Sequence, residues 1–388
     1  MKFSSKILKC QLSPVRKFNP CADQAVAAGR TIYHLNIGQP DVKTPEAFYE
    51  AIRDFKAETL EYAPAPGLSA HIEAVQAYYA KLGVKLDKGD ILATSGGGEA
   101  LEFILACILD EGDEILVPDP AWLNYHNVPR MLGAVPVTYS LKEENGYQMD
   151  LAELRSKVTD KTKAVVIITP NNPTGGVLSQ DTLQGLADLA IEKDLLVISD
   201  EVYERLIYDG EKHISIASLP GMKERTFTMN GMSKAYSMTG WRLGYVAAPE
   251  AYIAVLNKFH QHNTTCAPSF VQTASVAALR DEKNEVNDMV KEYQRRRDYA
   301  VKAINDIPGL SCLCPKGAFY IFINCKSLGK PSAELASYLL DEAKIALVPG
   351  DVFGPGGEGY LRLSFANSYD NIVEGCKRLA QAVAKLRQ

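Results

Sequence analysis

The sequence has no long hydrophobic run. None of its apolar stretches is long enough to span a bilayer, and its first residues contain only Ile7 and Leu8 as an adjacent apolar pair. A signal peptide needs a continuous apolar core, so these residues do not resemble one. We therefore expect a cytoplasmic protein with no membrane partner.

The sequence also lacks an excess of basic charge. It has 42 Lys and Arg residues against 47 Asp and Glu residues, which gives a net charge of −5. A protein that holds the phosphate backbone of a nucleic acid needs a concentration of positive charge. This balance argues against a nucleic-acid partner, and any small anion must be bound by a local site.

Metal-ligand spacing is absent as well. No CxxC pair occurs, and we interpret the eight cysteines as buried free thiols; they lie at positions 10, 21, 107, 266, 312, 314, 325 and 376. His260, His262 and Cys266 resemble half of a metal site, but no second pair of ligands follows them. We expect structural or interface histidines and no bound metal.

What the chain does contain is an alternation of strand and helix signals, over 388 residues that exceed one ordinary core. Short apolar runs alternate with segments of helical spacing, which is typical of a mostly parallel sheet covered by helices. The predicted strands are 91–94, 114–117, 164–169, 195–199 and 226–229, and the predicted helices are 99–109 and the segment from the N-cap Ser179 to Glu192.

The C-terminal part follows a different order. A long helical stretch over about 269–304 precedes the predicted strands 318–324 and 361–365, and a last amphipathic helix is predicted over 372–386. A run of helices and few strands indicates a smaller α+β domain. The sequence therefore predicts an α/β protein with a second, C-terminal domain.

The first residues lack this periodicity. Residues 1–36 show neither strand nor helical spacing, so we expect an arm that packs on another surface. We predict three regions: the arm with part of the small domain over 1–45, a large domain over 46–285, and the small domain over 286–388.

One stretch, NGMSKAYSMTGWRLGY at 230–245, concentrates unusual residues. It places Lys234 in a turn between Met232 and Ala235, with Arg242 eight positions later. A lysine is a nucleophile only as the free amine, and apolar surroundings or a nearby cation favour that form. The alternative is a solvated loop lysine, but the rest of the chain supplies the parts needed by a carbonyl cofactor with a phosphate tail.

Polar residues collect where the predicted strands end. Asp200 directly follows the strand 195–199, Tyr203 comes three residues later, and Asn172 opens the turn after the strand 164–169. In a parallel sheet, ligands bind at the carboxyl ends of the strands. Asp200 alone is as typical of a helix cap, but the three residues together indicate a binding site.

The glycine run Gly96 to Gly98 joins a predicted strand to a helix. Free N–H groups in the first turn of a helix bind phosphate, and glycines let the phosphate approach closely. The run is neither GxGxxG nor a P-loop, which disfavours a dehydrogenase or an NTPase. As a lone signal it is explained nearly as well by a tight turn.

Trp122 and Arg362 are two further candidates. Trp122 lies just past a strand, where its ring either stacks on a flat cofactor or belongs to the core. Arg362 interrupts an apolar strand, and a buried arginine needs an anion because an unpaired one is strongly destabilising. That anion is either an internal carboxylate or the carboxylate of a substrate.

Together these residues resemble the class I aminotransferases, the fold type I enzymes that use pyridoxal 5′-phosphate, and most of all their bacterial aspartate and broad-specificity branch. The resemblance covers nearly the whole chain and rests on motifs in the family's order and spacing: GQPD (38–41), YAPAPG (62–67), NNPTGG (171–176), SDEVY (199–203), SKAYSMTGWRLGY (233–245) and RLSFA (362–366). It implies a seven-stranded, mostly parallel sheet in the large domain, amino-acid and 2-oxo-acid substrates, and a homodimer with shared active sites.

The resemblance implies a role for each candidate. Lys234 forms a Schiff base with the cofactor aldehyde and later moves the proton of the substrate Cα, Asp200 meets the ring nitrogen, and Tyr203 and Asn172 meet the ring hydroxyl. Trp122 stacks on the ring. The phosphate is held by Gly97, Gly98, Ser233, Arg242 and a Tyr62 that reaches in from the second subunit. The substrate α-carboxylate pairs with Arg362, beside Trp122, Asn172 and the Gly38 amide.

One position departs from the family. Aspartate-specific bacterial members carry a lysine after the two phosphate-loop glycines, and it meets the distal carboxylate; here that residue is Gly98. Arg16 and Lys17 of the arm are candidates to replace this charge, and the alternative is that both are solvated.

We expect the enzyme to move an amino group from an L-amino acid, with aspartate favoured, to a 2-oxo acid such as 2-oxoglutarate. The alternatives are a neutral or aromatic amino-acid aminotransferase and a C–S β-lyase of the same fold. A non-enzymatic regulator on this fold is disfavoured, since the chain has neither the length nor the basic segment for an added DNA-binding domain.

Overall fold

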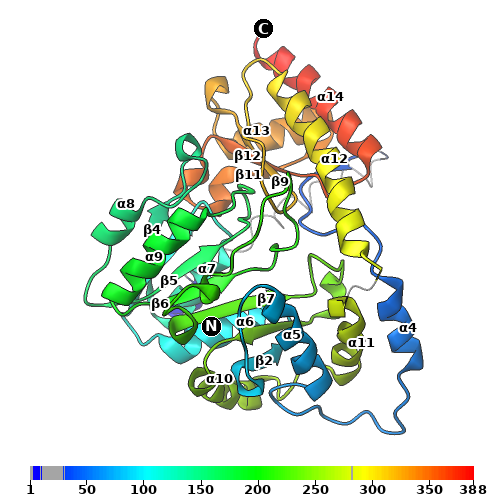
Figure 1. Cartoon of the computed structure of the whole chain (residues 1–388). Coiled ribbons are helices and arrows are strands. Elements are labelled where there is room, and N and C mark those ends of the chain that lie inside the picture. The colour runs from blue at the N-terminus through cyan, green and yellow to red at the C-terminus, as the bar shows by residue number, and fades with distance from the viewer. Residues whose placement is uncertain (1–2, 9, 11–28, 30, 281–282) are drawn as a thin grey trace.

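The computed structural model describes residues 3–8, 10, 29, 31–280 and 283–388, and its centre is a seven-stranded sheet (Figure 1). The strand order is β2-β8-β7-β6-β5-β3-β4. The bounds are β2 Ile91–Thr94, β3 Glu114–Asp119, β4 Val135–Ser140, β5 Thr162–Ile168, β6 Leu196–Asp200, β7 Thr226–Gly231 and β8 Gly244–Ala247. Only β8 runs antiparallel to its neighbours. The predicted seven-stranded, mostly parallel sheet is thus confirmed.

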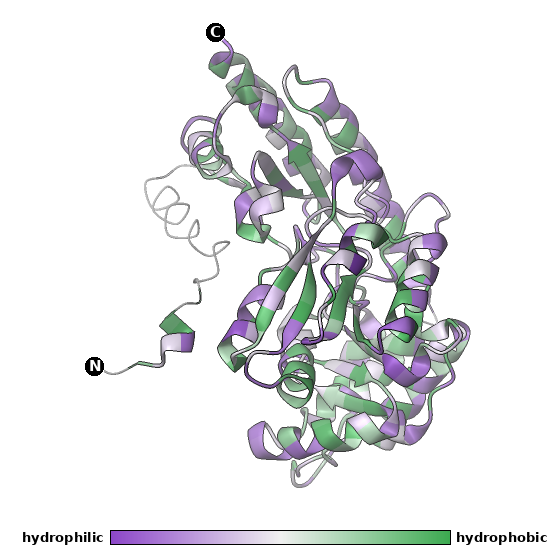
Figure 2. Ribbon diagram, turned by 90° about the vertical axis from the view of Figure 1, so that its left-hand side faces the viewer, coloured by the Kyte–Doolittle hydropathy of each residue, from purple (hydrophilic) through white to green (hydrophobic). Residues whose placement is uncertain are grey.

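Helices cover both faces of this sheet, because alternate side chains of a strand point to opposite faces. In β5, Val166 and Ile168 pack in one buried cluster, with residues of α6 and α10, whereas Val165 and Ile167 pack in another, with residues of α9. Figure 2 shows mostly hydrophobic strands among helices that alternate in hydropathy. The helices are α5 Ser69–Lys81, α6 Gly97–Ile108, α7 Asn124–Leu132, α8 Leu151–Ser156, α9 Gln180–Glu192, α10 Glu250–Asn263 and α11 Ser269–Arg280.

The C-terminal part forms its own layer above this sheet (Figure 1). A three-stranded antiparallel sheet has the order β11-β12-β9, with β9 Tyr320–Asn324, β11 Val348–Pro349 and β12 Tyr360–Ser364. The helices beside it are α12 Glu285–Asn305, α13 Ser332–Tyr338, a π-helical segment Leu339–Ala343 and α14 Tyr369–Leu386. The two predicted strands and the predicted last helix of this part are observed, and α13 with the short strands β10 (Ile345–Ala346) and β11 lies between the two strands.

The N-terminal segment joins that second layer. Strand β1 (Tyr33–His34) pairs in parallel with β10 (Ile345–Ala346), and helix α4 (Glu46–Asp54) follows it. Helix α1 (Ser5–Leu8) precedes Cys10, whose Sγ lies 3.9 Å from the carbonyl oxygen of Asn127 in α7. The described start of the arm therefore contacts the large sheet's helices, whereas residues 11–28 lie outside the described residues.

Two expectations need correction. The stretch predicted as one helix over 269–304 is two helices, because Asn284 adopts a left-handed φ of +54° before α12 begins. Helix α6 begins at Gly97, so two of the glycines assigned to the turn belong to its first residues.

The cysteines are only partly as expected. Those that the structure describes are free, and three of them are buried: Cys312, Cys325 and Cys376. Cys314 is exposed because it lies in the connection that leads to β9, and Cys10, Cys107 and Cys266 are half-buried, so the prediction of burial was wrong for these four. Cys21 lies outside the described residues.

None of the helices in the described residues is long and apolar enough to cross a membrane, and the described His, Cys, Asp and Glu side chains form no group of three that could hold a metal ion. His260 is buried, with its ring centroid 5.2 Å from that of Phe103. This packing fits the interpretation of a structural histidine.

The buried guanidinium of Arg297 joins α12 to the segment that follows β6, and its loss gives a test of the fold. Its side chain is 2% exposed and donates to both carboxylate oxygens of Asp209, at 2.7 and 2.8 Å. Arg297→Ala should lower the free energy of unfolding in urea by about 2–3 kcal/mol, because charged hydrogen bonds are lost while Asp209 stays partly hydrated.

The matched control is Arg295→Ala in the same helix. The Arg295 side chain is 53% exposed and pairs with Glu292, so its loss should change the urea midpoint much less than the loss of Arg297. Equal urea midpoints for the two variants would show that the buried arginine does not join the two parts.

Candidate active site

The candidate residues meet at one edge of the large sheet. Trp122 follows β3, Asn172 follows β5, Asp200 ends β6 and Lys234 follows β7. These strands are parallel, so their carboxyl ends lie at the same edge. The structure therefore brings together residues that are 112 positions apart at the extremes, as their places after strands predicted.

Lys234 is enclosed by aromatic rings and one backbone carbonyl. Its Nζ donates to the carbonyl oxygen of Gly38 at 2.6 Å and lies 5.7 Å and 5.8 Å from the ring centroids of Tyr203 and Phe319. Burial and the nearby Arg362 cation lower the pKa of Lys234 to about 8. The free amine, which a nucleophile requires, therefore becomes the main form above pH about 8, well below the range in which an ordinary lysine loses its proton.

The cation that matters most for Lys234 differs from the one expected. The sequence suggested Arg242, which does lower the lysine pKa, but Arg362 has the larger effect. Asp200 acts in the opposite direction and favours the protonated amine. The position of Arg362 beside Lys234 follows from the packing of the second sheet on the first, which no local pattern encodes.

Asp200 is a buried carboxylate with two donors. It is 5% exposed, and it accepts hydrogen bonds from the hydroxyl of Tyr125 and, at 3.0 Å, from the amide of Val202. Burial raises the pKa of Asp200 to about 6, against the effect of these hydrogen bonds. A cationic group in contact with this carboxylate would lower its pKa again, so the site favours a positively charged ring nitrogen.

Arg362 is the second buried cation of the site. It is 3% exposed, and its Nη1 donates to the Asn172 Oδ1 at 2.9 Å while its Nη2 donates to the Asn36 carbonyl at 2.7 Å. Its Nε has no hydrogen-bond partner, and none of the described carboxylates forms an ion pair with it. Two anions were considered as partners of Arg362, and the described residues provide no internal carboxylate for it. The guanidinium can therefore bind the carboxylate of a substrate.

The glycine run and Arg242 form a cradle. Gly96 has a φ of +96°, and a Cβ placed there would lie 2.5 Å from the Arg242 Nη2, so only glycine lets the guanidinium lie this close. Arg242 Nη2 donates to the Ser95 carbonyl at 3.1 Å. The first N–H groups of α6, from Gly97 and Gly98, have no acceptor within the helix. Helix terminus and guanidinium together make an anion site.

Of the remaining predicted residues, some lie near Asp200 or Lys234, one is exposed elsewhere, and two lie outside the described residues. Trp122 is half-buried, and its ring centroid is 5.6 Å from that of Tyr125, next to Asp200. Ser233 is half-buried beside Lys234. Tyr62 is 84% exposed, in the segment that joins α4 to α5 at the outer edge of the chain in Figure 1. Arg16 and Lys17 lie outside the described residues.

Two residues of the site were missed from the sequence. Tyr125 donates to Asp200, and Tyr320 shares a hydrogen bond of 2.8 Å with Tyr203, hydroxyl to hydroxyl. Tyr125 lies one helical turn after Trp122, and that spacing was an available signal. Tyr320 lies in a buried apolar strand, where an aromatic residue is ordinary.

These residues fit pyridoxal 5′-phosphate. Its aldehyde requires a free amine, its ring nitrogen a carboxylate, and its phosphate an anion site. Lys234, Asp200 and the cradle of α6 with Arg242 supply these three groups at one edge of the sheet. Gly38 belongs to the same site, although it faces Lys234 with its carbonyl rather than its amide.

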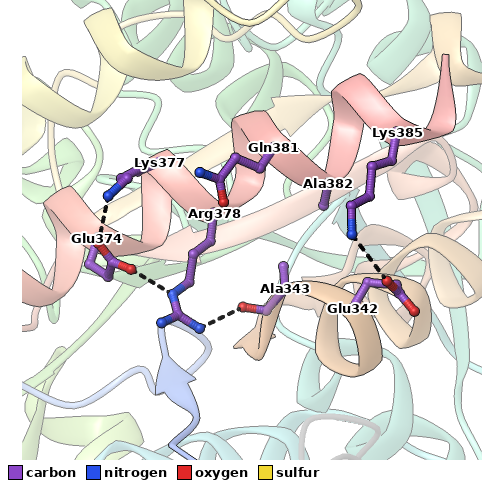
Figure 3. A pocket seen from close by; sticks show the side chains of 8 residues that line it. All are labelled: Glu342, Ala343, Glu374, Lys377, Arg378, Gln381, Ala382 and Lys385. Carbon is purple, nitrogen blue, oxygen red and sulfur yellow. Dashed lines mark hydrogen bonds and ion pairs between the residues drawn. The ribbon is translucent and has the colours of Figure 1, made fainter. Parts of the chain in front are cut away.

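Other hollows lie away from this edge. One of about 320 Å³ lies between α14 and the segment Leu339–Ala343 (Figure 3), and its charges pair with one another, with Arg378 to Glu374 at 2.8 Å and Lys385 to Glu342 at 3.6 Å. Another of about 850 Å³ is lined by the loops around residues 146–148 and 174–180. Neither contains Lys234 or Arg362.

Comparison with known proteins agrees with this geometry. A family model described as aminotransferase class I and II matches residues 30–379. The aspartate aminotransferase of Pyrococcus abyssi is 43% identical, over 92% of this chain and 93% of its own length, and aromatic-amino-acid aminotransferase 2 of Thermococcus litoralis is 42% identical, over 91% and 92%. The solved aspartate aminotransferase from Thermus thermophilus with maleate is 33% identical, with a TM-score of 0.93 over 98% of this chain and 100% of that chain.

The lowered pKa of Lys234 predicts how fast its amine reacts. In the cofactor-free protein, labelling of Lys234 by an amine-directed reagent should rise through pH about 8 and level off above it, because only the deprotonated amine reacts. Arg362→Met should move the midpoint to higher pH, since a cation that favours the free amine is removed. Mass spectrometry of the digest measures the labelling, with exposed lysines as internal reference. A native midpoint near pH 10.4, about the value for a free lysine, would contradict the prediction.

Proposed function

The chain belongs to the class I and II aminotransferases, and we propose that it transfers the amino group of a dicarboxylic amino acid, with aspartate favoured, to 2-oxo acids such as 2-oxoglutarate. It is an enzyme that uses pyridoxal 5′-phosphate, an amino acid and a 2-oxo acid. The observation that carries the proposal is the buried Arg362, which has neutral partners only among the described residues and lies close enough to Lys234 to lower its pKa.

We assign separate roles to the two cationic residues, Arg362 and Lys234. Arg362 binds the α-carboxylate of the amino acid and so fixes the substrate Cα beside Lys234. The cofactor, when bound, withdraws the electrons that the Cα–H bond releases. Lys234, with its lowered pKa, would act as the general base that takes the Cα proton at its Nζ and later gives it back. Asp200 keeps a positive charge on the ring nitrogen, since its carboxylate is buried and directed by Tyr125 and Val202.

The cradle is proposed to hold the phosphate. The Gly97 and Gly98 amides and the Arg242 guanidinium supply hydrogen bonds and charge, and Ser233 lies next to Lys234. Trp122 would cover one face of the ring, and Tyr203 and Asn172 would meet its hydroxyl. These residues would hold the cofactor at the edge of the sheet where Lys234 lies.

A dicarboxylate needs a second cation. A Cβ at Gly98 would meet nothing within 4 Å, so the family's lysine position is open space here. Arg16 and Lys17 of the arm are proposed to supply the missing charge. The similarity to two aspartate aminotransferases, one of them solved with maleate, supports a dicarboxylate as substrate.

The open space at Gly98 also favours a second candidate. An aromatic or neutral side chain needs volume rather than a charge, and the similarity to the aromatic-amino-acid aminotransferase of Thermococcus litoralis supports this substrate class. The two substrate classes differ in one property: a cation in the site stabilises the distal carboxylate of a dicarboxylic amino acid, but it has no charge to pair with on a neutral or aromatic side chain.

A panel of amino donors separates these candidates. The native protein, Arg16→Ala and Lys17→Ala are assayed with aspartate, glutamate, alanine and phenylalanine against 2-oxoglutarate. Loss of the pairing cation should lower kcat/KM for aspartate on the order of thirtyfold, while alanine and phenylalanine change little, because a paired charge in a closed site contributes about 2–5 kcal/mol.

Lys6→Ala is the matched control for this panel. Lys6 lies on the same arm, but its Nζ is 2.8 Å from the place of a Cβ on Gly133, which precedes β4 at the opposite edge of the sheet. It should leave all four donors unchanged. If neither Arg16→Ala nor Lys17→Ala separates aspartate from alanine, the substrate is a neutral or aromatic amino acid.

The assembly is proposed to be a homodimer with shared sites, in the cytoplasm. Tyr62 is 84% exposed and Leu60 62% exposed, in a segment that leads away from its own sheet. The proposal is that this segment reaches the phosphate cradle of a second copy. A closed two-fold dimer then has two such composite sites.

Hybrid dimers test the shared site. Lys234→Ala and Tyr62→Ala are each poorly active at limiting cofactor, but co-expression should restore about a quarter of native activity, because half of the dimers are hybrids with one complete site. The control pair is Lys234→Ala with Asp200→Ala, whose hybrids contain no complete site. Absence of recovery with the first pair, or a fully active monomer in sedimentation, would exclude the shared site.

A further inference from the structure

Tyr320 lies between two residues to which the proposed function gives different roles, Arg362 and Tyr203. It belongs to β9, is 1% exposed, and comes from the small antiparallel sheet rather than the large one. Its ring lies 4.3 Å below the Arg362 guanidinium carbon, and its hydroxyl is 2.8 Å from the Tyr203 hydroxyl. One side chain thus contacts the proposed carboxylate-binding cation and the proposed partner of the cofactor ring hydroxyl.

Strand register explains the first contact. In the β12–β9 pair, Arg362 is opposite Phe322 and Ser364 is opposite Tyr320. Tyr320 and Arg362 are therefore diagonal neighbours on one face, which long side chains can bridge. The ring supports the guanidinium from below, and the Asn172 and Asn36 oxygens hold two of its nitrogens.

The hydroxyl of Tyr320 also packs closely against the backbone of the segment that carries Gly38. A Cβ on Gly38 would lie 2.6 Å from this hydroxyl, so the backbone passes the ring at closest approach. The Gly38 carbonyl accepts the hydrogen bond of Lys234 at 2.6 Å. The position of Tyr320 therefore also bears on where the acceptor of the lysine lies.

We propose that Tyr320 is a positioning residue that couples occupation of Arg362 by a substrate carboxylate to the hydrogen bond of Tyr203. The inference rests on the proposed function of this site. Its physical basis is charge: Arg362 favours the ionised form of both phenols, Tyr203 and Tyr320. A bound carboxylate offsets that charge, which makes both phenols less acidic and Tyr203 a weaker hydrogen-bond donor toward the ring hydroxyl.

A purely structural role makes a different prediction, and the chain offers a matched control. Tyr208 is also 1% exposed, its ring lies 4.8 Å below the Arg297 guanidinium carbon, and its hydroxyl donates to the Ala318 carbonyl. Tyr208 therefore resembles Tyr320 in its burial, in the cation over its ring and in the hydrogen bond of its hydroxyl. Among the hydrogen bonds and ring contacts of the described residues, however, none joins Tyr208 to Tyr203 or Arg362. Tyr208→Phe therefore measures the loss of a buried hydroxyl alone.

The experiment uses the holoenzyme and reads the visible absorbance of its cofactor. The pH titration of that band is recorded with and without maleate, a dicarboxylate that has no amino group to transfer. In native protein and Tyr208→Phe, maleate should shift the midpoint of the titration. In Tyr320→Phe the midpoint without maleate should differ from native, and the shift on adding maleate should shrink by half or more.

Kinetics provide a second readout. Tyr320→Phe keeps the ring below Arg362, so KM for the amino donor should stay within about threefold while kcat falls by about tenfold, the effect of one lost hydrogen bond. Tyr320→Leu also removes the ring, so KM should rise as well. If Tyr320→Leu does not fold, the phenylalanine variant alone decides.

The outcomes separate this inference from the function it rests on. A native protein without a visible cofactor band, or without transfer to 2-oxoglutarate, contradicts the proposed function. A native protein with the band and the maleate shift, but with the same titration and kcat in Tyr320→Phe as in Tyr208→Phe, overturns the coupling by Tyr320 alone. A native protein with the band but no maleate shift overturns the coupling as well.

Discussion

Two cationic side chains, the half-buried Lys234 and the buried Arg362, lie at the same place, and the site depends on how their charge is balanced. Arg362 has only the oxygens of Asn172 and Asn36 as partners among the described residues, and Lys234 has the Gly38 carbonyl. Burial next to a permanent cation makes the lysine the group that gives up its proton, because a guanidinium does not. The same arrangement that prepares an amine for reaction also leaves an arginine ready for an external carboxylate.

The fold supplies this arrangement through two sheets that meet. The large parallel sheet places Asp200 and Lys234 at the carboxyl ends of adjacent strands, β6 and β7. The small antiparallel sheet carries Arg362 and Tyr320 on neighbouring strands. The segment after β1 runs between them, and its Asp41 carboxylate is held by the Arg296 guanidinium of α12 at 2.8 and 2.9 Å. Charge, hydrogen bonds and register therefore fix three separate stretches of chain around one amine.

Much of the fold was predictable because local sequence and tertiary environment agree there. The strands β5 and β6 are mostly buried and contain continuous apolar runs, and Ser179 caps α9 with its side chain as predicted. Some of the features that were missed have weak local signals. Strand β4 is a half-buried edge strand with a proline, α7 contains Pro129, and the break before α12 depends on the left-handed conformation of Asn284.

The sequence by itself determined the chemistry: Lys234 in a tight turn, Asp200 and Asn172 after strands, a glycine run before a helix, and an arginine inside an apolar strand. These features are local, since each depends on a residue type and its place in one element. Only the tertiary structure decided which groups act on one another. Beside the effect of burial, Arg362 lowers the pKa of Lys234 more than Arg242 does, Tyr125 donates to Asp200, and Tyr320 contacts both Arg362 and Tyr203. Electrostatic effects and hydrogen bonds depend on distances between atoms, and those distances are set by how two sheets pack, which no stretch of sequence contains.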